Sequence, residues 1–345
     1  MTSPNPMVGA VLVKKGKIIS EDFHRRPGTP HAEALVIEKA AGNARGSTLY
    51  INLEPCCHTE KRTPPCTKAV IAAGIREVVI GMKDPNPKVS GRGISELQKA
   101  GIHVRTGVLE NEAKRLNEAY IKYITKGIPF VIMKIAMTLD GKIATPKGQS
   151  KWITSEKARN MVHRLRGSVD SIITAIGTVK ADDPELTARI KGGKTPLRII
   201  IDPNLEVPLH SKVLQVPPQT IIVTKKLEVS SQQSEKKKIL LDKGIEIIEY
   251  EGKKADLQWL MKRLGEKEIV SSLIEAGSSF NASALEEGIV DKVMFFIAPK
   301  IIGGKESFPA VGGRTFRSLA DAHRLRDIKI HRVGEDILVE GYLEK

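Results

Sequence analysis

The residues that decide the fold of the first part of the chain are His31-Ala32-Glu33 and the run 55–66, PCCHTEKRTPPC. One imidazole and two thiolates give a zinc ion three protein ligands and leave a fourth tetrahedral position open for water. We therefore predict His31, Cys56 and Cys66 as zinc ligands. Cys56 is preferred to Cys57 because it directly follows Pro55, although the sequence leaves Cys57 open as the ligand.

Glu33 lies two residues after the histidine, where its carboxylate can move protons without binding the metal. The pattern H-x-E followed by P-C-x-x-C is the signature of zinc deaminases, in which this glutamate is the general acid and base. Here nine residues, instead of two, separate Cys56 from Cys66. A surface histidine and small buried cysteines would be the ordinary interpretation of each residue alone. Together, the motifs His31-Ala32-Glu33, Pro55-Cys56 and Pro64-Pro65-Cys66 favour a catalytic zinc site.

The bulk composition indicates a globular protein of two domains. The chain has 345 residues, 41% of them hydrophobic, and this length exceeds the usual size of one domain. All three cysteines lie within eleven positions, which favours a metal site over a disulfide framework. No apolar run approaches the roughly 20 residues that span a membrane, and the first ten residues do not resemble a secretory signal. We expect a cytoplasmic protein with no membrane partner.

The net charge of +15 suits two classes of partner, nucleic acids and small phosphorylated molecules. The aromatic content of 4% is low for a protein that stacks unpaired bases. The lysines are scattered along the chain, apart from the run Lys236-Lys237-Lys238. We therefore expect a small phosphorylated substrate and no nucleic-acid partner, and we leave a homo-oligomer open.

The chain alternates apolar, strand-like segments with helix-like segments, which indicates α/β layered sheets. In the first third we expect strands at 8–13, 48–53, 77–81 and 103–108, and helices at 32–41, 67–73, 94–100 and 110–125. The pattern breaks at Lys126-Gly127-Ile128-Pro129, which predicts domains at 1–126 and 128–345. In the second domain we expect strands at 130–136, 171–176, 197–201, 220–223, 246–250, 269–274 and 292–297, and helices at 155–166, 256–264 and 281–287.

Longer motifs resemble those of the bifunctional riboflavin-biosynthesis deaminase–reductase family, and the resemblance covers nearly the whole chain. In the first domain they are Thr2-Ser3-Pro4-Asn5-Pro6-Met7-Val8-Gly9, His24, His31-Ala32-Glu33, Glu54-Pro55-Cys56-Cys57-His58, Arg62-Thr63-Pro64-Pro65-Cys66, Asp84-Pro85-Asn86-Pro87 and Gly91-Arg92-Gly93. The widened cysteine spacing is similar to that of this family. The resemblance implies an α/β protein in which a cytidine-deaminase-like three-layer domain precedes a dihydrofolate-reductase-like domain.

For the first domain, the resemblance implies zinc-dependent deamination of 2,5-diamino-6-ribosylamino-4(3H)-pyrimidinone 5′-phosphate. Asn5 and Asn86 offer donors and acceptors for a pyrimidine edge, whereas Arg62 and His58 suit phosphate or ribose oxygens. On chemistry alone, residues 84–87 would be an ordinary turn. The substrate pocket implied by the motifs consists of Asn5, His24, His58, Arg62, Thr63, Asp84 and Asn86.

Two features depart from the family's usual pattern. The loop between Cys56 and Cys66 is one residue longer, so Arg62 and Thr63 are aligned by their Arg-Thr-Pro-Pro motif only. The family usually has a short helix before Thr-x-Pro-Asn-Pro, whereas Met1 directly precedes Thr2 here. We interpret this as a late start or a truncation, and expect a partly uncovered sheet and a weakened deaminase domain that an upstream extension would stabilise.

In the second domain, the expected strand 269–274 leads to Glu275-Ala276-Gly277-Ser278-Ser279 and a helix, an arrangement that can cradle a phosphate with backbone N–H groups. No G-x-G-x-x-G motif is present, and an ordinary loop and helix cap explains these residues equally well. The resemblance implies NADPH-dependent reduction of the ribosyl chain to 5-amino-6-ribitylaminouracil 5′-phosphate. It implies substrate contacts from Ser150, Arg166, Leu186, Arg189 and Glu275, and cofactor contacts from Ala136, Trp152, Thr178, Asp182, Gly277, Ser278, Ser279, Phe280, Asn281, Ala282 and Ser283. Surface ion pairing is the commoner role of arginine.

Three alternatives stay open. A tRNA or other nucleic-acid base deaminase would suit the +15 charge but would leave the second domain unexplained. A scaffold protein with a structural zinc would need a fourth ligand, such as Cys57 or His58. The third alternative is an enzyme in which only one half is active.

Overall fold

The computed structural model describes residues 2–58, 64–218, 220–226, 231–313 and 318–344. Its internal contacts divide the chain into two compact units, Met1–Gly127 and Ile128–Lys345. Gly127 follows the last helix of the first unit and has a φ of 69°, a left-handed conformation that suits glycine at a helix end. Over the described residues, none of the helices combines the length and apolar content that crossing a bilayer requires.

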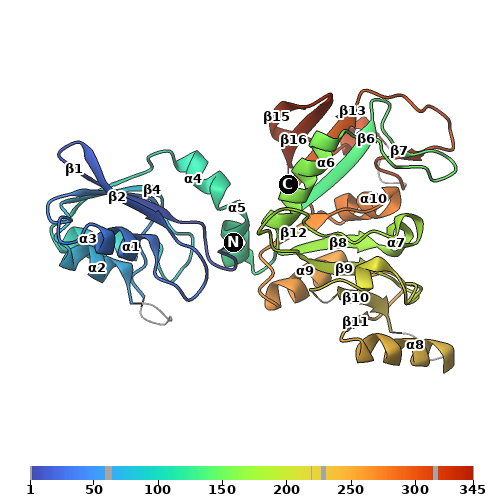
Figure 1. The fold of residues 1–345 in the computed structure, drawn as a ribbon, viewed down its shortest axis with the longest axis horizontal. Coiled ribbons are helices and arrows are strands. Elements are labelled where there is room, and N and C mark those ends of the chain that lie inside the picture. The colour runs from blue at the N-terminus through green and yellow to red at the C-terminus, as the bar shows by residue number, and fades with distance from the viewer. Residues whose placement is uncertain (1, 59–63, 219, 227–230, 314–317, 345) are drawn as a thin grey trace. The chain divides into compact units, whose positions relative to one another are not determined.

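The first unit contains a five-stranded sheet in the order β2-β1-β3-β4-β5 (Figure 1). Strand β1 pairs antiparallel with β2 and β3, whereas β3, β4 and β5 are parallel to one another. The carboxyl ends of β3 and β4 therefore meet at one edge, where the loops that follow them come together. The strands are β1 (Gly9–Lys14), β2 (Lys17–Phe23), β3 (Thr48–Leu53), β4 (Glu77–Met82) and β5 (His103–Thr106).

Three helices pack on the apolar face of this sheet, with Val36, Val70 and Leu97 in its main core. A second cluster joins the ends of β3 and β4 to the last two helices through Leu53 and Met82. Figure 1 shows α4 on the opposite side of the sheet from α1, α2 and α3, so that the unit has three layers. The helices are α1 (Ala32–Lys39), α2 (Cys66–Ala72), α3 (Arg92–Lys99), α4 (Glu110–Leu116) and α5 (Glu118–Lys126).

The structure differs from the sequence-based expectation at three places in this unit. Strand β2 was not expected; it pairs with β1 through a tight turn at Lys15 and Gly16, both with positive φ. The helix expected at 110–125 is two helices, because the chain breaks at Asn117, whose side chain bonds the backbone of Met7. The strand expected to reach residue 108 ends at Thr106.

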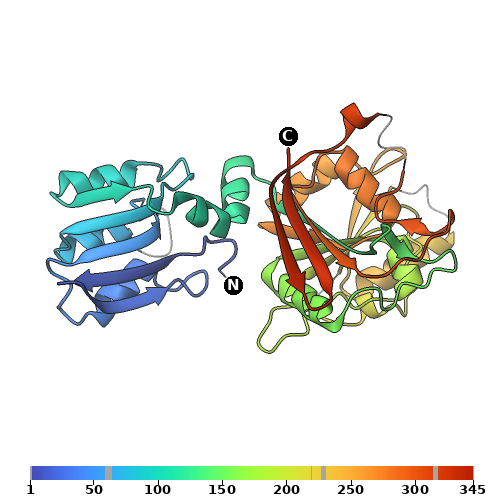
Figure 2. The same ribbon diagram turned by 90° about the horizontal axis from the view of Figure 1, so that it is seen from above.

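The second unit contains a nine-stranded sheet in the order β11-β10-β9-β8-β12-β6-β13-β16-β15. The pairings from β11 to β13 are parallel, and the hairpin β15–β16 adds two antiparallel strands at one edge (Figure 2). The strands are β6 (Phe130–Thr138), β8 (Ser171–Ala175), β9 (Leu197–Ile201), β10 (Thr220–Lys225), β11 (Glu246–Tyr250), β12 (Ser271–Ile274), β13 (Lys292–Ala298), β15 (Leu325–Val333) and β16 (Asp336–Leu343). Two short strands, β7 (Lys142–Ala144) and β14 (Phe308–Pro309), pair separately.

The helices of the second unit connect these parallel strands and cover an apolar core that includes Val131, Ile199 and Leu260. Ser155 caps α6 by accepting a hydrogen bond from the Ala158 amide at 3.3 Å, as the sequence favours. The hairpin β15–β16 was not expected, because β15 is exposed almost throughout and lacks the apolar pattern of a buried strand. Helix α7 was not expected either. The helices are α6 (Glu156–Ser168), α7 (Ile176–Asp182), α8 (Ser231–Asp242), α9 (Leu257–Glu266) and α10 (Ser278–Glu286), with 3₁₀ turns at Lys212–Leu214 and Leu319–Asp321.

Candidate functional site

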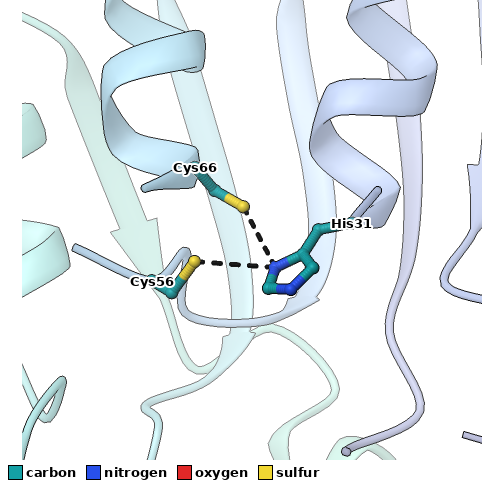
Figure 3. A group of neighbouring side chains, drawn as sticks. All are labelled: His31, Cys56 and Cys66. Carbon is teal, nitrogen blue, oxygen red and sulfur yellow. Dashed lines mark hydrogen bonds between the residues drawn. The ribbon is translucent and has the colours of Figure 1, made fainter. Parts of the chain in front are cut away.

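The first unit brings the three predicted zinc ligands together. His31 immediately precedes α1, Cys66 begins α2, and Cys56 lies in the loop after β3. Their ligand atoms all lie within 4.8 Å of one another. The His31 Nδ1 atom lies 3.6 Å from the Cys56 sulfur and 3.2 Å from the Cys66 sulfur (Figure 3). Zinc bonds of about 2.0 Å to nitrogen and 2.3 Å to sulfur separate tetrahedral ligands by roughly 3.5 Å, so this donor set fits zinc.

The same geometry bears on the alternatives that the sequence left open. Cys56, and not its half-buried neighbour Cys57, shares the cluster with His31 and Cys66. Within the described part of the chain the cluster has three such ligands, whereas a structural zinc site has four. The arrangement is that of a metal centre with an open position.

Glu33 lies in the first turn of α1, directly beside the cluster. Its side chain is buried, and its Oε2 atom has no hydrogen-bond partner among the described residues. Burial, and secondarily the neighbouring Cys56, raises the pKa of the Glu33 carboxyl. A buried carboxylate oxygen without a partner is costly unless a ligand or water uses it, so Glu33 is placed to exchange protons beside the metal.

Asn5 and His24 form a hydrogen-bonded pair next to the zinc ligands. The His24 Nδ1 atom bonds the Pro30 carbonyl at 3.2 Å, which leaves Nε2 to accept from the Asn5 side-chain amide at 3.0 Å. The His24 ring meets the His31 ring edge-on, with 5.2 Å between centroids. Burial lowers the pKa of His24, which favours the neutral form of this imidazole.

Asp84 and Asn86 follow β4 and belong to one hydrogen-bonded loop. The Asp84 Oδ1 atom accepts from the Asn86 backbone at 2.9 Å and from the Tyr120 hydroxyl at 3.0 Å. Burial raises the pKa of Asp84 to about 6. The Asn86 Oδ1 atom accepts from the Lys88 backbone at 3.0 Å, so the Asn86 amide group is partly committed to its own loop. His58 is half-buried beyond Cys57, and the predicted residues Arg62 and Thr63 lie outside the described residues.

Glu54 and Gly93 also shape this site. The sequence analysis named both within longer motifs but predicted no role for either. The Glu54 carboxylate accepts from the backbone amides of Asp84 at 3.2 Å, Gly91 at 3.0 Å and Ile94 at 3.2 Å. A Cβ atom on Gly93 would lie 2.2 Å from the Pro55 carbonyl oxygen, so only glycine permits this contact. These residues tie the segment of Cys56 to the loop of Asp84.

The second unit contains a cavity of about 880 Å³, large enough for a sizeable cofactor and a small substrate. It is lined by every predicted reductase residue except Ala282 and Ser283. These two lie further along α10, where Ala282 is buried in the core. The lining residues are Ala136, Ser150, Trp152, Arg166, Thr178, Asp182, Leu186, Arg189, Glu275, Gly277, Ser278, Ser279, Phe280 and Asn281.

A buried charge cluster forms one wall of the cavity. The Arg166 guanidinium pairs with both Glu275 carboxylate oxygens at 2.6 and 3.0 Å, and the Lys134 ammonium lies 3.4 Å from Glu275. Burial alone would raise the pKa of Glu275, but Arg166 and Lys134 outweigh it and hold the pKa at about 2. Lys134 was not predicted; its signal is a single lysine within the apolar strand β6.

Other predicted residues contact further residues of the cavity lining. The Ser150 hydroxyl donates to Asp182 at 3.0 Å, which joins a predicted substrate residue to a predicted cofactor residue. Arg189, in contrast with Arg166, makes an exposed ion pair with Glu185 at 3.0 Å. Trp152 is 63% exposed, and the Arg159 guanidinium stacks on its ring at 4.6 Å.

The start of α10 has the features of an anion cradle. Gly277 precedes the helix without a side-chain cap, and its missing Cβ would lie 3.7 Å from the Thr178 hydroxyl. Among the described residues, the buried Ser278 Oγ and Asn281 Oδ1 atoms have no hydrogen-bond partner. Free backbone amides at a helix start favour phosphate groups, so this corner fits the diphosphate of a dinucleotide.

Comparisons with known proteins agree with the presence of two sites. The sequence model described as the cytidine and deoxycytidylate deaminase zinc-binding region matches residues 1–82. The model described as the RibD C-terminal domain matches residues 129–339. The riboflavin biosynthesis protein RibD of Aquifex aeolicus is 44% identical over 98% of this chain and 92% of its own length. The RibD protein of Escherichia coli is 40% identical over 97% of this chain and 93% of its own length.

Solved structures extend the similarity to the fold. Acinetobacter baumannii RibD superposes with a TM-score of 0.88 at 34% identity, covering 100% of this chain and 94% of that one. A Thermotoga maritima protein described as a diaminohydroxyphosphoribosylaminopyrimidine deaminase/5-amino-6-(5-phosphoribosylamino)uracil reductase superposes with a TM-score of 0.84 at 36% identity. That match covers 99% of this chain and 93% of the Thermotoga chain. Both units therefore have the predicted fold class, a cytidine-deaminase-like domain followed by a reductase domain.

Proposed function

This chain belongs to the family of bifunctional riboflavin-biosynthesis deaminase–reductases, and from that premise we propose its substrate and the roles of its residues. The protein is an enzyme with hydrolase and oxidoreductase activities, and its cofactors are Zn²⁺ and NADPH. The proposed substrate is 2,5-diamino-6-ribosylamino-4(3H)-pyrimidinone 5′-phosphate. Water first replaces its 2-amino group, releasing ammonia. A hydride then adds to ribose C1 and a proton to the ring oxygen as the C1–O bond breaks, which opens the ribosyl group and gives 5-amino-6-ribitylaminouracil 5′-phosphate.

The observation that carries this proposal is the presence of two separate constellations in one chain. The first unit contains the His31, Cys56 and Cys66 cluster beside the buried Glu33, and the second contains the 880 Å³ cavity with a helix-start cradle. We assign deamination to residues 1–126 and reduction to residues 128–345. A deaminase of nucleic-acid bases would have no use for the second cavity.

In the deaminase, His31, Cys56 and Cys66 would hold zinc. Bound zinc lowers the pKa of its water to about 7 and so makes hydroxide available at neutral pH. Glu33 is the general acid and base: its carboxylate accepts the proton of the attacking water and returns it to the leaving amine. The orphan Oε2 atom of Glu33 is the atom available for this transfer.

We propose that the substrate ring lies between two groups of polar side chains near the cluster. Asn5 and His24 present an amide and an imidazole, and Asp84 and Asn86 present hydrogen-bonding groups from the loop after β4. His58, Arg62 and Thr63 are proposed to contact the ribose phosphate, on the strength of the family motif. Charge-assisted hydrogen bonds from arginine suit phosphate oxygens.

In the reductase, Ser150, Arg166, Leu186, Arg189 and Glu275 are proposed to bind the substrate. NADPH supplies the hydride that reaches ribose C1. The residues proposed to bind this cofactor are Ala136, Trp152, Thr178, Asp182 and the 277–283 segment, in which the amides at the start of α10 would receive the diphosphate. Since Ala282 and Ser283 do not line the cavity, they would act through the helix backbone.

We also propose that the protein works in the cytoplasm as a homo-oligomer. Strand β15 is the last strand of its sheet, and it exposes Ile328 and Ile330 at 55% and 69%. An exposed edge strand with apolar side chains is a template for pairing with another chain. Light scattering on the purified protein tests the oligomer, and a monomer at micromolar concentration would contradict it.

The function is tested by incubating the purified protein with the diaminopyrimidinone phosphate, with and without NADPH. Without NADPH, we expect ammonia release and the deaminated ribosyl product; with NADPH, we expect stoichiometric NADPH oxidation and the ribityl product. Removal of zinc by a chelator should stop ammonia release and leave reduction of the deaminated substrate intact. Absence of ammonia release from the zinc-loaded protein would contradict the proposal.

A further inference from the structure

Helix α5 and its N-cap residue Asn117 contact two segments of the deaminase site, the one of Asn5 and Met7 and the one of Asp84 and Asn86. We propose that Tyr120 is a positioning residue of the deaminase, because its hydroxyl joins Asp84 and Asn86 in one hydrogen-bonded arrangement that faces the substrate. This inference rests on the proposed function and deepens it, since it identifies a residue that holds the substrate loop, the segment after β4 that carries Asp84 and Asn86.

The first step of the argument is the set of contacts made by the Tyr120 hydroxyl. It donates to Asp84 Oδ1 at 3.0 Å. The Asn86 backbone amide also donates to Asp84 Oδ1, at 2.9 Å. One oxygen of Asp84 therefore accepts from both the Tyr120 hydroxyl and the Asn86 backbone, and Tyr120 is the donor supplied by α5.

The second step is the rigidity of the Tyr120 ring. The ring is only 8% exposed and packs in an apolar cluster with Leu53, Met82 and Ala113. Leu53 and Met82 are the last residues of β3 and β4, directly before the segments that carry Cys56 and Asp84. A hydroxyl on such a fixed ring can set the position of a loop, because packed side chains hold one rotamer.

The third step is a parallel contact at the start of the same helix. The Asn117 side chain accepts from the Met7 amide at 2.8 Å and donates to the Met7 carbonyl at 3.0 Å. Met7 lies two residues after Asn5, which bonds His24. Helix α5 thus braces the two segments that present Asn5 and Asp84, and it lies outside the matched zinc-binding region, residues 1–82. All three zinc ligands lie outside this helix, so we expect its contacts to act on substrate alignment more than on zinc binding.

The test is Tyr120→Phe in the full-length, zinc-loaded enzyme, assayed by ammonia release. Loss of one hydrogen bond to a charged group should raise KM for the diaminopyrimidinone phosphate about tenfold. The kcat should fall by less than about threefold, because Glu33 and the zinc ligands are untouched. Zinc content should stay at one per chain, and NADPH-dependent reduction of the deaminated substrate should be unchanged.

Two further variants make the test specific. Tyr50→Phe removes a hydroxyl from an exposed position of β3 in the same unit and should leave KM, kcat and zinc content as in the wild type. In an Asp84→Ala background, adding Tyr120→Phe should raise KM by less than about threefold, since Tyr120 acts largely through Asp84. A further tenfold rise in that background would overturn the proposal.

The remaining outcomes also decide the matter. An unchanged KM in Tyr120→Phe would overturn the positioning role. A joint fall of kcat, zinc content and soluble yield at constant KM would overturn it as well, because the hydroxyl would then serve stability. Failure of the wild-type enzyme to release ammonia would instead contradict the proposed function, so the two failures are distinguishable.

Discussion

The two units each contain a buried carboxylate in their candidate pocket, and the two carboxylates have opposite electrostatic environments. Asp84 receives hydrogen bonds from the uncharged donors Asn86 and Tyr120, and burial raises its pKa to about 6. Glu275 is also buried, but Arg166 and Lys134 hold its pKa at about 2. The comparison shows that burial by itself does not decide the charge of an acid, because a directed cation can outweigh desolvation.

The difference suits the two chemistries proposed for the units. A carboxyl that titrates near pH 6 can either donate or accept a hydrogen bond, which suits the edge of a pyrimidine that changes from amine to carbonyl. A permanently ionised carboxylate between two cations instead fixes the shape of a pocket that must hold a phosphorylated substrate. Glu275 pairs with Arg166 and Lys134, and burial lowers the pKa of the Lys134 ammonium although Glu275 opposes that shift.

The largest expected effect is the loss of one activity, deamination, while the other activity, reduction, is unchanged. Glu33→Gln should lower kcat/KM for ammonia release by about 10²- to 10⁴-fold, because the amide cannot carry a proton. Reduction of the deaminated substrate by the same preparation should keep its wild-type rate and serves as the internal control. Deamination at more than about a tenth of the wild-type rate would show that another group carries the proton.

A second prediction removes the paired carboxylate. Glu275→Gln leaves Lys134 and Arg166 buried without their counter-charge, which should destabilise the second unit by about 3–5 kcal/mol. Denaturant unfolding measures this, and ammonia release should be unaffected. The matched control is Glu266→Gln, which removes an exposed carboxylate whose ion pair with Arg263 is 2.8 Å long; it should change the free energy of unfolding by less than about 1 kcal/mol. Equal effects of the two variants would contradict the role given to burial.

A third prediction concerns the unpaired carboxylate and has the opposite sign. The folded-state pKa of Asp84 is raised from 3.8 to about 6, so ionisation of this carboxyl opposes folding. The contribution of protonated Asp84 to the free energy of unfolding is therefore complete below pH 3.8 and is lost as the pH rises through about 6. At pH 7 the cost reaches up to about 3 kcal/mol.

Asp84→Asn keeps an oxygen that accepts from Tyr120 and Asn86 but cannot ionise. This variant should therefore be more stable than the wild type at pH 7 by an amount that shrinks as the pH falls from 6 to 4. Urea unfolding at several pH values measures this difference. A difference that is constant with pH would show that Asp84 does not titrate in this range.

The fourth and smallest expected effect is a loss of zinc affinity caused by a steric clash near the metal ligands. Gly93→Ala would place a Cβ 2.2 Å from the Pro55 carbonyl oxygen, so the backbone before Cys56 must shift. Displacing a group that positions a metal ligand should weaken zinc binding about 10- to 100-fold, measurable by competition with a chelator. Gly9→Ala, where a Cβ meets nothing within 4 Å, is the control and should bind zinc as the wild type does.

The sequence predicted the local features of both units well. His31 and Cys66 stand at helix starts, as their Pro and H-x-E contexts indicate, and the alternation of apolar segments located most strands. It missed β2, the short strands β7 and β14, the hairpin β15–β16 and helix α7. Strand β15 is exposed almost throughout, and β2 is stabilised by its pairing with β1, so the apolar pattern that marks a buried strand is weak in both.

The site residues also divide into those that sequence motifs could predict and those whose role depends on partners in the folded structure. The zinc cluster could be predicted because three reactive residue types with fixed spacing have one common chemical use. Lys134, Glu54 and Tyr120 could not, since a lone lysine, glutamate or tyrosine has many roles and only its partners distinguish them. The helix expected at 110–125 illustrates the limit: its break at Asn117 depends on Met7, which lies 110 residues away in the chain.

The sequence by itself determined the α/β class, the family and the residue types of the metal site, because periodicity and short motifs are local properties of the chain. Only the tertiary structure decided how the surroundings of each buried carboxylate shift its pKa, which cysteine joins His31, and which helix contacts Asp84. These properties depend on distances between residues far apart in the chain, and on the loss of solvent around them. A charge or a hydrogen bond in a protein interior is set by what surrounds it, and folding is what supplies those surroundings.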